Sequence, residues 1–301
     1  MWKRSRGDKI FDACNVLFFI LFGVCTLYPF WSLLMTSFMD ATGYYNTTLN
    51  LWPGSGFKLD AYRYIFSTKW IPTGYLNTVV YTIGGTAWTM LLVCLASFAM
   101  TKPNLPGKRF FSLYFLLTMY FSGGIVPFYI IVTQYLKLYN TRLAMMITSG
   151  LSVWSYLVLR NFINAIPASL TESARIDGAS EGLILRKVIL PLCLPSMLTL
   201  TMMAFVAYWN DWFNALIFLQ NEYLFPLQII VRRMIIDTRI TPNAVNEMKN
   251  AYKMQEGWGI QMFEPAIKAA VVMVTVIPII IIYPFIQKYF DQGVMVGSIK
   301  E

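Results

Sequence analysis

Long apolar runs alternate with short polar stretches along the whole chain. A helix needs about 20 mostly apolar residues to cross the hydrocarbon core of a bilayer. Six runs reach that length, and we predict one transmembrane helix in each: 11–38, 75–101, 109–134, 143–163, 186–219 and 264–287. The fifth run exceeds one span, so its start, as far as Pro195, is expected outside the hydrocarbon or in a continuing cytoplasmic helix.

Glycine and proline interrupt the third run at "SGGIVP", residues 122–127. In lipid, a broken backbone must be satisfied by neighbouring helices, side chains or cavity water. The break therefore indicates either a kink in a packed bundle or a helix beside a water-filled path.

Basic residues set the expected orientation, because Lys and Arg concentrate in short cytoplasmic loops. Three groups flank the predicted spans: Lys3, Arg4, Arg6 and Lys9; Lys102, Lys108 and Arg109; Arg160, Arg175, Arg186 and Lys187. Six spans place all three groups on one side of the membrane. We therefore predict cytoplasmic termini, a cytoplasmic segment 164–185, and external segments 39–74 and 220–263.

Composition supports a membrane protein. Of 301 residues, 57% are hydrophobic and 13% are charged, against about 25% charged residues in soluble domains. This length fits one helix bundle, so residues 1–301 are predicted to form a single transmembrane domain. The net charge of +9 suits cytoplasmic loops and contact with anionic lipid headgroups. No basic run interleaves with aromatics on a polar face, so nucleic acid is not expected as a partner.

Several kinds of chemistry are excluded by residue type. The chain has no histidine, and its four cysteines lie in or beside apolar runs without a CxxC pair. Neither a His-based catalytic site nor a zinc site is therefore expected. Glu172 and Asp177 are five residues apart and point in different directions on a helix, so they do not form a paired-carboxylate site. We predict no catalytic and no metal-binding residues.

The polar stretch "TESARIDGAS" lies between the fourth and fifth runs. Pro167 suits a helix start, and Ser169 or Thr171 suits its N-cap, with Ser169 and Glu172 in the spacing of a capping box. Gly178 is typical of a helix end followed by a turn. We predict a short amphipathic helix whose small residues let a partner approach closely.

This stretch and the run after it, "ESARIDGASEGLILRKVILPLCLP", resemble the EAA motif of ABC importer permeases. Departures from the family pattern are conservative and occur at Ser173, Leu185 and Val188. The segments "GGIVPFY", "WNDW", "YPFIQKYF" and "GVMVGSIK" are similar to the family branch that imports oligosaccharides and polysaccharide fragments. Motif positions are matched at Glu172, Ala174, Asp177, Gly178, Ala179, Leu190, Pro191 and Pro195.

The resemblance implies an all-α membrane protein with six transmembrane helices and a cytoplasmic coupling helix, within 167–185, between helices four and five. It implies two cytoplasmic ATPase partners that hold ATP and Mg, a second and different permease, an extracytoplasmic solute-binding protein, and a bacterial inner-membrane location. This chain would need no cofactor. The coupling residues would be Glu172, Ser173, Ala174, Asp177, Gly178 and Ala179.

A candidate substrate surface follows from "AYWNDWFNA", residues 207–215. Polar groups at membrane depth usually face a cavity or partner, although tryptophans also form interfacial belts. On one helix, Trp209 and Trp212 would share a face. The candidate pathway residues are Trp209, Asn210, Asp211, Trp212, Asn214, Tyr120 and Gln134.

Arg232 and Arg233 lie in the predicted external segment. Their charge suits an acidic sugar such as a uronate, or an alginate-like oligomer, but equally suits Asp237 or acidic groups on the binding protein. The alternative to a permease is an ion-coupled secondary transporter. That class often shows inverted repeats and acids near the midplane. No repeat is evident here, and the candidate acids at membrane depth are few: Asp12 and Asp211 near span ends, and Glu264. A membrane-embedded enzyme is disfavoured by the missing histidine.

Overall fold

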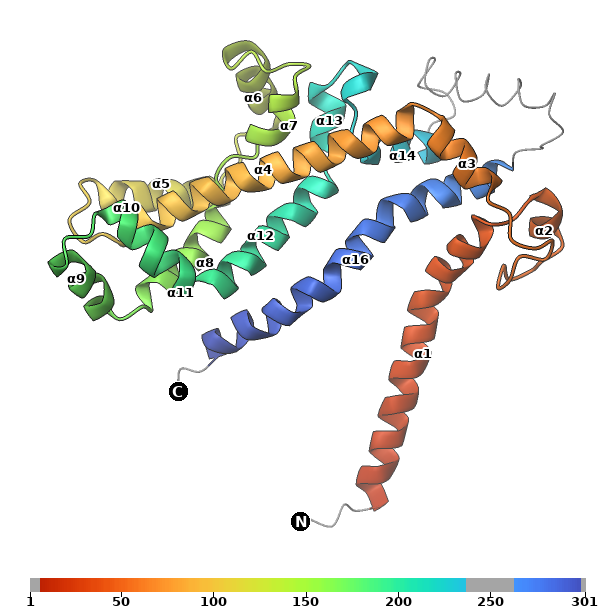
Figure 1. The fold of residues 1–301 in the computed structure, drawn as a ribbon, viewed down its shortest axis with the longest axis horizontal. Helices are drawn as coiled ribbons and strands as arrows, with labels where there is room; N and C mark the ends of the chain where they lie inside the picture. Colours follow the sequence, from red (N-terminus) through yellow and green to blue (C-terminus); the bar gives the residue numbers. More distant parts are fainter. Residues whose placement is uncertain (1–5, 237–262, 299–301) are drawn as a thin grey trace. The chain divides into compact units, whose positions relative to one another are not determined.

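The computed structural model describes residues 6–236 and 263–298, and every regular element in those ranges is helical (Figure 1). The chain divides into two compact parts. One part comprises Met1–Lys69 and Arg233–Val276, and the other comprises Trp70–Arg232 and Ile277–Glu301. The predicted external segment 220–263 lies largely outside the described residues, as do both chain ends.

The first part contains α1 (Arg6–Thr36), α2 (Ala41–Tyr45), α3 (Asp60–Ser67) and the beginning of α16 (Glu264–Ser298). The most apolar window of α1 has no buried residue. A helix that is apolar on all sides requires apolar surroundings, and the α1 surface therefore suits lipid.

A loop after α1 is closed at its base by Asp40. The Asp40 carboxylate accepts hydrogen bonds from the backbone N–H of Gly43 at 2.7 Å and the Ser55 hydroxyl at 2.6 Å, and it pairs with Lys58. The Lys58 ammonium, followed by the Ser55 and Gly43 donors, holds the pKa of this carboxyl well below its usual range. One side chain therefore joins both ends of the loop.

The second part begins with its longest helix, α4 (Trp70–Thr101). Next come α5 (Lys108–Tyr120), α6 (Ile125–Ile130), η1 (Ile131–Tyr135), α7 (Arg142–Ile147) and α8 (Val153–Asn164). They are followed by α9 (Ala168–Ile176), α10 (Glu181–Ile184), η2 (Leu185–Ile189), α11 (Leu190–Leu192) and α12 (Leu194–Trp209). The remaining elements are α13 (Phe213–Phe218), η3 (Glu222–Leu224) and α14 (Leu227–Ile236).

Helix α4 packs against α12, α8 and α7 (Figure 1). Gly85 makes the approach of α12 possible, since a Cβ there would lie 2.3 Å from Cε1 of Tyr208. The Tyr208 hydroxyl shares a 2.9 Å hydrogen bond with Thr89 and donates to the Met146 carbonyl at 3.1 Å. Tyr208 thus connects α4, α12 and α7.

Polar side chains on α4 also satisfy the irregular backbone before α14. Asn77 donates from Nδ2 to the carbonyls of Tyr223 at 2.7 Å and Phe225 at 3.1 Å. The Thr78 hydroxyl accepts from the Leu227 N–H at 2.8 Å, and the Tyr81 hydroxyl donates to the Leu224 carbonyl at 2.8 Å. Buried backbone groups without such partners would be costly.

Three described helices are long and apolar enough to cross a membrane: Gly7–Thr36, Trp70–Thr101 and Glu264–Ile282. Two bent pairs raise the number of candidates to five if each pair is one span: Lys108–Tyr120 with Ile125–Tyr135, bent by 114°, and Glu181–Leu192 with Leu194–Trp209, bent by 85°. The first bend falls at "SGGIVP", which confirms the predicted break.

The predicted span 143–163 is not one continuous helix. It consists of α7 and α8, separated by residues 148–152. Gly150 adopts a left-handed φ of +55°, and the Ser152 hydroxyl accepts from the Ser155 N–H at the start of α8. The apolar run concealed a turn made by the short sequence "TSGLS".

We predict that Gly85→Ala lowers the melting temperature of the purified chain. The added methyl group must displace the buried Tyr208 ring, and overpacking of this kind costs about 1–3 kcal/mol. Gly23→Ala is the matched control, because nothing lies within 4 Å of a Cβ at Gly23 and alanine favours a helix by about 1 kcal/mol. Equal melting temperatures for the two variants would contradict the close packing.

The depressed pKa of Asp40 predicts a loop that withstands mild acid. A carboxyl whose pKa is lowered by folding contributes stability above its unfolded pKa, near 4, and this is lost as pH falls through the folded value. Protection of residues 41–57 from proteolysis should therefore be constant between about pH 8 and 5. Asp40→Asn should reduce that protection at neutral pH. A wild-type loss of protection near pH 6 would contradict this assignment.

Candidate functional site

The "TESARIDGAS" stretch forms α9 and the turn that follows it. The helix begins at Ala168 after Pro167, as expected. The predicted capping box is wrong, because Pro167 occupies the N-cap position, and Thr171 instead donates to the Ala168 carbonyl at 2.9 Å. Ser169 lies inside the first turn of the helix.

The end of α9 confirms the expectation for Gly178. Its φ is +82°, and the N–H of Ala179 donates to the Ala174 carbonyl at 2.9 Å while the Gly178 N–H donates to the Arg175 carbonyl at 3.0 Å. This pair of bonds is a Schellman motif. No atom lies within 4 Å of a Cβ at Gly178, so glycine is favoured there by backbone conformation and not by crowding.

The motif residues divide into two groups by their surroundings. Ala174 and Ala179 pack against a buried cluster that contains Ile184 and Ile189. The exposed residues of the motif are Glu172, Ser173, Asp177 and Gly178. The two alanines pack α9 against the core of its own chain, whereas the exposed residues are accessible from outside the chain.

Glu181 joins this segment to α4, and sequence reasoning missed it. The carboxylate accepts from Nε of Arg175 at 3.0 Å and pairs with Lys102, just beyond the end of α4. Lys102 also lies over the Phe98 ring, with Nζ 3.8 Å from the ring centroid. Lys102 and Glu181 are 79 positions apart in sequence, so no local pattern could have revealed the pair.

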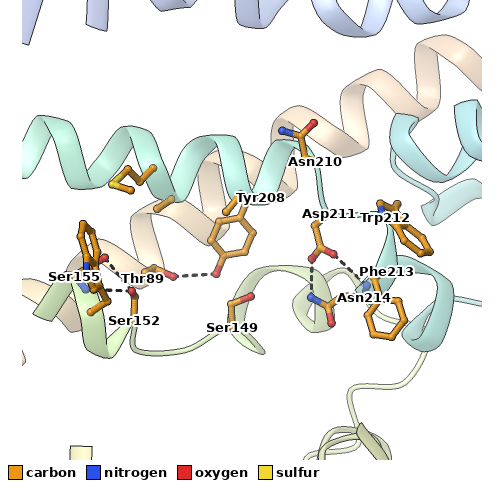
Figure 2. Close-up of a pocket in the computed structure, with 14 residues that line it drawn as sticks. Thr89, Ser149, Ser152, Ser155, Tyr208, Asn210, Asp211, Trp212, Phe213 and Asn214 are labelled. Carbon is orange, nitrogen blue, oxygen red and sulfur yellow. Dashed lines mark hydrogen bonds between the residues drawn. The ribbon is translucent and has the colours of Figure 1, made fainter. Parts of the chain in front are cut away.

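A second candidate site is a cavity of about 530 Å³ beside α12 (Figure 2). Its volume lies within the usual range for small-molecule sites. The cavity lies among α4, the turn between α7 and α8, and the break between α12 and α13. Its lining residues are Thr89, Ser149, Ser152, Trp154, Ser155, Met203, Ala204, Ala207, Tyr208, Asn210, Asp211, Trp212, Phe213 and Asn214.

Four of the predicted pathway residues line this cavity: Asn210, Asp211, Trp212 and Asn214. Trp209 does not, because α12 ends there and its buried ring stacks on Phe205 with centroids 5.9 Å apart. The sequence pattern predicted that Trp209 and Trp212 share one helix face, and this prediction is wrong. Tyr120 and Gln134 are exposed on α5 and η1 and are not among the lining residues.

Asp211 stabilises the break in the fifth predicted span. Its carboxylate accepts from the Asn214 N–H at 3.1 Å and from Asn214 Nδ2 at 2.7 Å (Figure 2). An acidic side chain that accepts backbone N–H groups at a helix start acts as a cap and complements the helix dipole. The Asp211 carboxylate thus holds α13 in place beside the cavity.

The cavity combines aromatic rings with hydroxyl and amide groups. Ser152 and Ser155 share a 2.9 Å hydrogen bond on one wall, and Trp154, Trp212 and Phe213 contribute rings. The guanidinium of Arg232 lies over the Trp212 ring, with Cζ 3.7 Å from the centroid. Arg232 therefore places a positive charge against the ring of a lining residue. Asp237, its suggested partner, lies outside the described residues.

Comparison with known proteins identifies the family. Residues 90–296 match the family described as "Binding-protein-dependent transport system inner membrane component". The polygalacturonan/rhamnogalacturonan transport system permease protein YtcP of Bacillus subtilis (strain 168) is 33% identical over 97% of this chain and 99% of its own length. The arabinooligosaccharides transport system permease protein AraQ of Halalkalibacterium halodurans is 26% identical over 99% of both.

A solved structure supports the same assignment. The crystal structure of a bacterial ABC transporter involved in the import of the acidic polysaccharide alginate contains a chain that matches with a TM-score of 0.87 and 29% identity. The match covers 96% of this chain and all of the other. The chain therefore belongs to the family of binding-protein-dependent transport system inner membrane components, the non-catalytic, multi-pass membrane permeases of ABC importers.

Proposed function

We propose that this chain is one permease of an ATP-driven importer of oligosaccharides or polysaccharide fragments, paired with a second and different permease. It would cross the membrane six times with both termini in the cytoplasm. Two cytoplasmic ATPase subunits would bind and hydrolyse ATP with Mg, and an extracytoplasmic solute-binding protein would deliver the sugar. The observation that carries this proposal is the capped α9 segment, which joins an exposed polar face to the core of the second part.

The α9 segment, within 167–185, is proposed to be the coupling helix. Transmission requires a rigid element whose contacts differ between two states. Pro167 and the Schellman turn at Gly178 limit bending at the two ends of α9. Glu181 links the same segment to Lys102 beside α4. A displacement of α9 by an ATPase would thus reach α4, α8 and α10 together.

The cavity beside α12 is proposed to be part of the sugar pathway. Hydroxyl and amide groups from Ser149, Asn210 and Asn214 can bond sugar hydroxyls, and the rings of Trp154 and Trp212 can cover the apolar faces of sugar rings. A concave site with a few convergent polar groups among aromatic rings suits a small organic ligand. Selectivity would be shared with the solute-binding protein.

An acidic saccharide is the proposed substrate class. Two similar proteins are described by the import of acidic polymers: YtcP for polygalacturonan and rhamnogalacturonan, and the structurally matched transporter for alginate. In this chain, the Arg232 guanidinium stacked on Trp212 offers a cation beside the cavity. It can attract a uronate carboxylate and offset the negative charge of Asp211.

We predict that Gly178→Arg in the reconstituted transporter abolishes the coupling between ATP hydrolysis and sugar uptake. Arginine disfavours the left-handed turn and obstructs the exposed face. Substrate-stimulated ATP hydrolysis should therefore fall about tenfold or more, which is the size of effect that a typical coupling free energy produces. Glu172→Lys should have the same effect while the chain remains in the membrane. ATPase activity and labelled sugar uptake in proteoliposomes provide the measurement.

Gly182→Arg is the matched control for this experiment. Gly182 is exposed in α10, and its surroundings also have no atom within 4 Å of a Cβ, but its backbone is helical. This variant should retain coupling. Normal substrate-stimulated ATP hydrolysis in the Gly178→Arg transporter would overturn the role proposed for α9.

We predict that Arg232→Gln reduces uptake of a uronate oligomer by about two- to fivefold, the range for a partly exposed charge pair. Uptake of a neutral oligosaccharide of equal length should change little. Arg232→Lys keeps the charge but loses the planar stack, so an intermediate result is expected. Undiminished uronate uptake by Arg232→Gln, at both low and high salt, would contradict the acidic-substrate proposal and leave the permease assignment intact.

A further inference from the structure

The loop between α1 and α3 has an unusual distribution of charge. Residues 41–57 contain no Asp, Glu, Lys or Arg. Asp40 and Lys58, which flank this stretch, form an ion pair with each other. The loop is therefore a closed, uncharged unit, although a long surface loop in water normally carries charged residues.

Two side chains of α1 hold this loop against the helix. The Tyr28 hydroxyl donates to the Leu49 carbonyl at 2.9 Å, and the indole N–H of Trp31 donates to the Leu51 carbonyl at 3.0 Å. Both donors precede the end of α1 at Thr36 by at least one helical turn. The loop therefore folds back along α1 and does not extend away from its end.

The position of these donors along α1 fixes the level of the loop. Asp12 is the last charged residue before Asp40. From Ala13 to Trp31 the helix rises about 27 Å at 1.5 Å per residue, and a hydrocarbon core is about 30 Å thick. Tyr28 and Trp31 therefore lie where the hydrocarbon gives way to headgroups, which is where Tyr and Trp are enriched. The bonded loop residues lie at that level too.

Large apolar side chains of the loop point away from the chain. Leu49 is 56% exposed, Leu51 51% and Trp52 61%. One side of Trp52 is supported by Phe57, with ring centroids 5.0 Å apart in an edge-to-face arrangement. An exposed apolar group of this kind marks contact with a membrane or another protein.

We propose that residues 45–57 anchor the chain in the headgroup region of the leaflet where α1 leaves the bilayer, with Leu49, Leu51 and Trp52 inserted among the lipids. Lipid is the proposed occupant because Tyr28 and Trp31 bind the loop at the level of the headgroups, where an exposed apolar group meets lipid, and because the apolar face of the loop continues onto α1. Tyr28 and Trp31 are themselves exposed beside it, and the apolar window of α1 has no buried residue. The anchor goes beyond sugar transport and fixes the height of the first part of the chain relative to the bilayer.

A fluorescent probe at position 51 tests the anchor in the full-length chain. Cys14, Cys25, Cys94 and Cys193 are replaced by alanine, Leu51→Cys is labelled with a nitrobenzoxadiazole, and the protein is placed in phosphatidylethanolamine/phosphatidylglycerol nanodiscs. The Leu51 carbonyl that accepts from Trp31 is retained by this change. Lipids brominated near the headgroup should quench the probe several-fold more strongly than aqueous iodide does.

Thr42→Cys provides the matched control, because Thr42 is exposed on α2 in the same loop. Its probe should be quenched by iodide and not by brominated lipid. Replacing both Tyr28 and Trp31 by phenylalanine removes the two donors, and the probe at position 51 should then become accessible to iodide. This second variant keeps the test informative even if the labelled site disturbs the loop locally.

Two outcomes would overturn the proposal. Iodide quenching at position 51 equal to that at position 42 would place the loop in water. Protection from both quenchers would show that a protein subunit covers the patch. Failure of the anchor would not affect the coupling role of α9, which lies in the other part of the chain.

Discussion

The second part of the molecule depends on the space that Gly85 leaves for the ring of Tyr208. Any side chain on α4 at this point would meet the ring of α12. With the ring in this space, its hydroxyl reaches both Thr89 and the Met146 carbonyl. Those contacts position α4, α12 and the end of α7, and the cavity is bordered by α4, α12 and the turn that follows α7. The shape of the cavity therefore depends on glycine at position 85.

Helix breaks near the cavity are possible because polar side chains compensate for lost backbone hydrogen bonds. Asn77, Thr78 and Tyr81 of α4 bind the backbone from Tyr223 to Leu227, and Asp211 accepts from the N–H of Asn214 in the first turn of α13. In a low-dielectric medium an unpaired backbone group costs several kcal/mol. These polar side chains thus have a structural role that is independent of any sugar.

The sequence predicted features that depend on neighbours along the chain. Apolar length located α1, α4 and α16, glycine and proline located the bend in 122–127, and Gly178 located the end of α9. It failed where a short turn was hidden in an apolar run, as between α7 and α8. It also failed where distant residues meet, as with Glu181 and Lys102. Four of the seven pathway candidates line the cavity, while Trp209 was misplaced because helical spacing was extended past the end of α12.

The division of the α9 motif into inward and outward residues has an evolutionary consequence. Ala174 and Ala179 face inward and are constrained by packing within their own chain, while Gly178, although exposed, is constrained by its left-handed backbone conformation. Glu172, Ser173 and Asp177 are exposed, and in the coupling role proposed for α9 they would be constrained by the ATPase subunit that they contact. Mutational drift at the outward positions can therefore be matched by compensating changes in a second gene, whereas drift at the inward positions must be compensated within the same gene. Positions within one short motif are thus expected to co-vary with different genes.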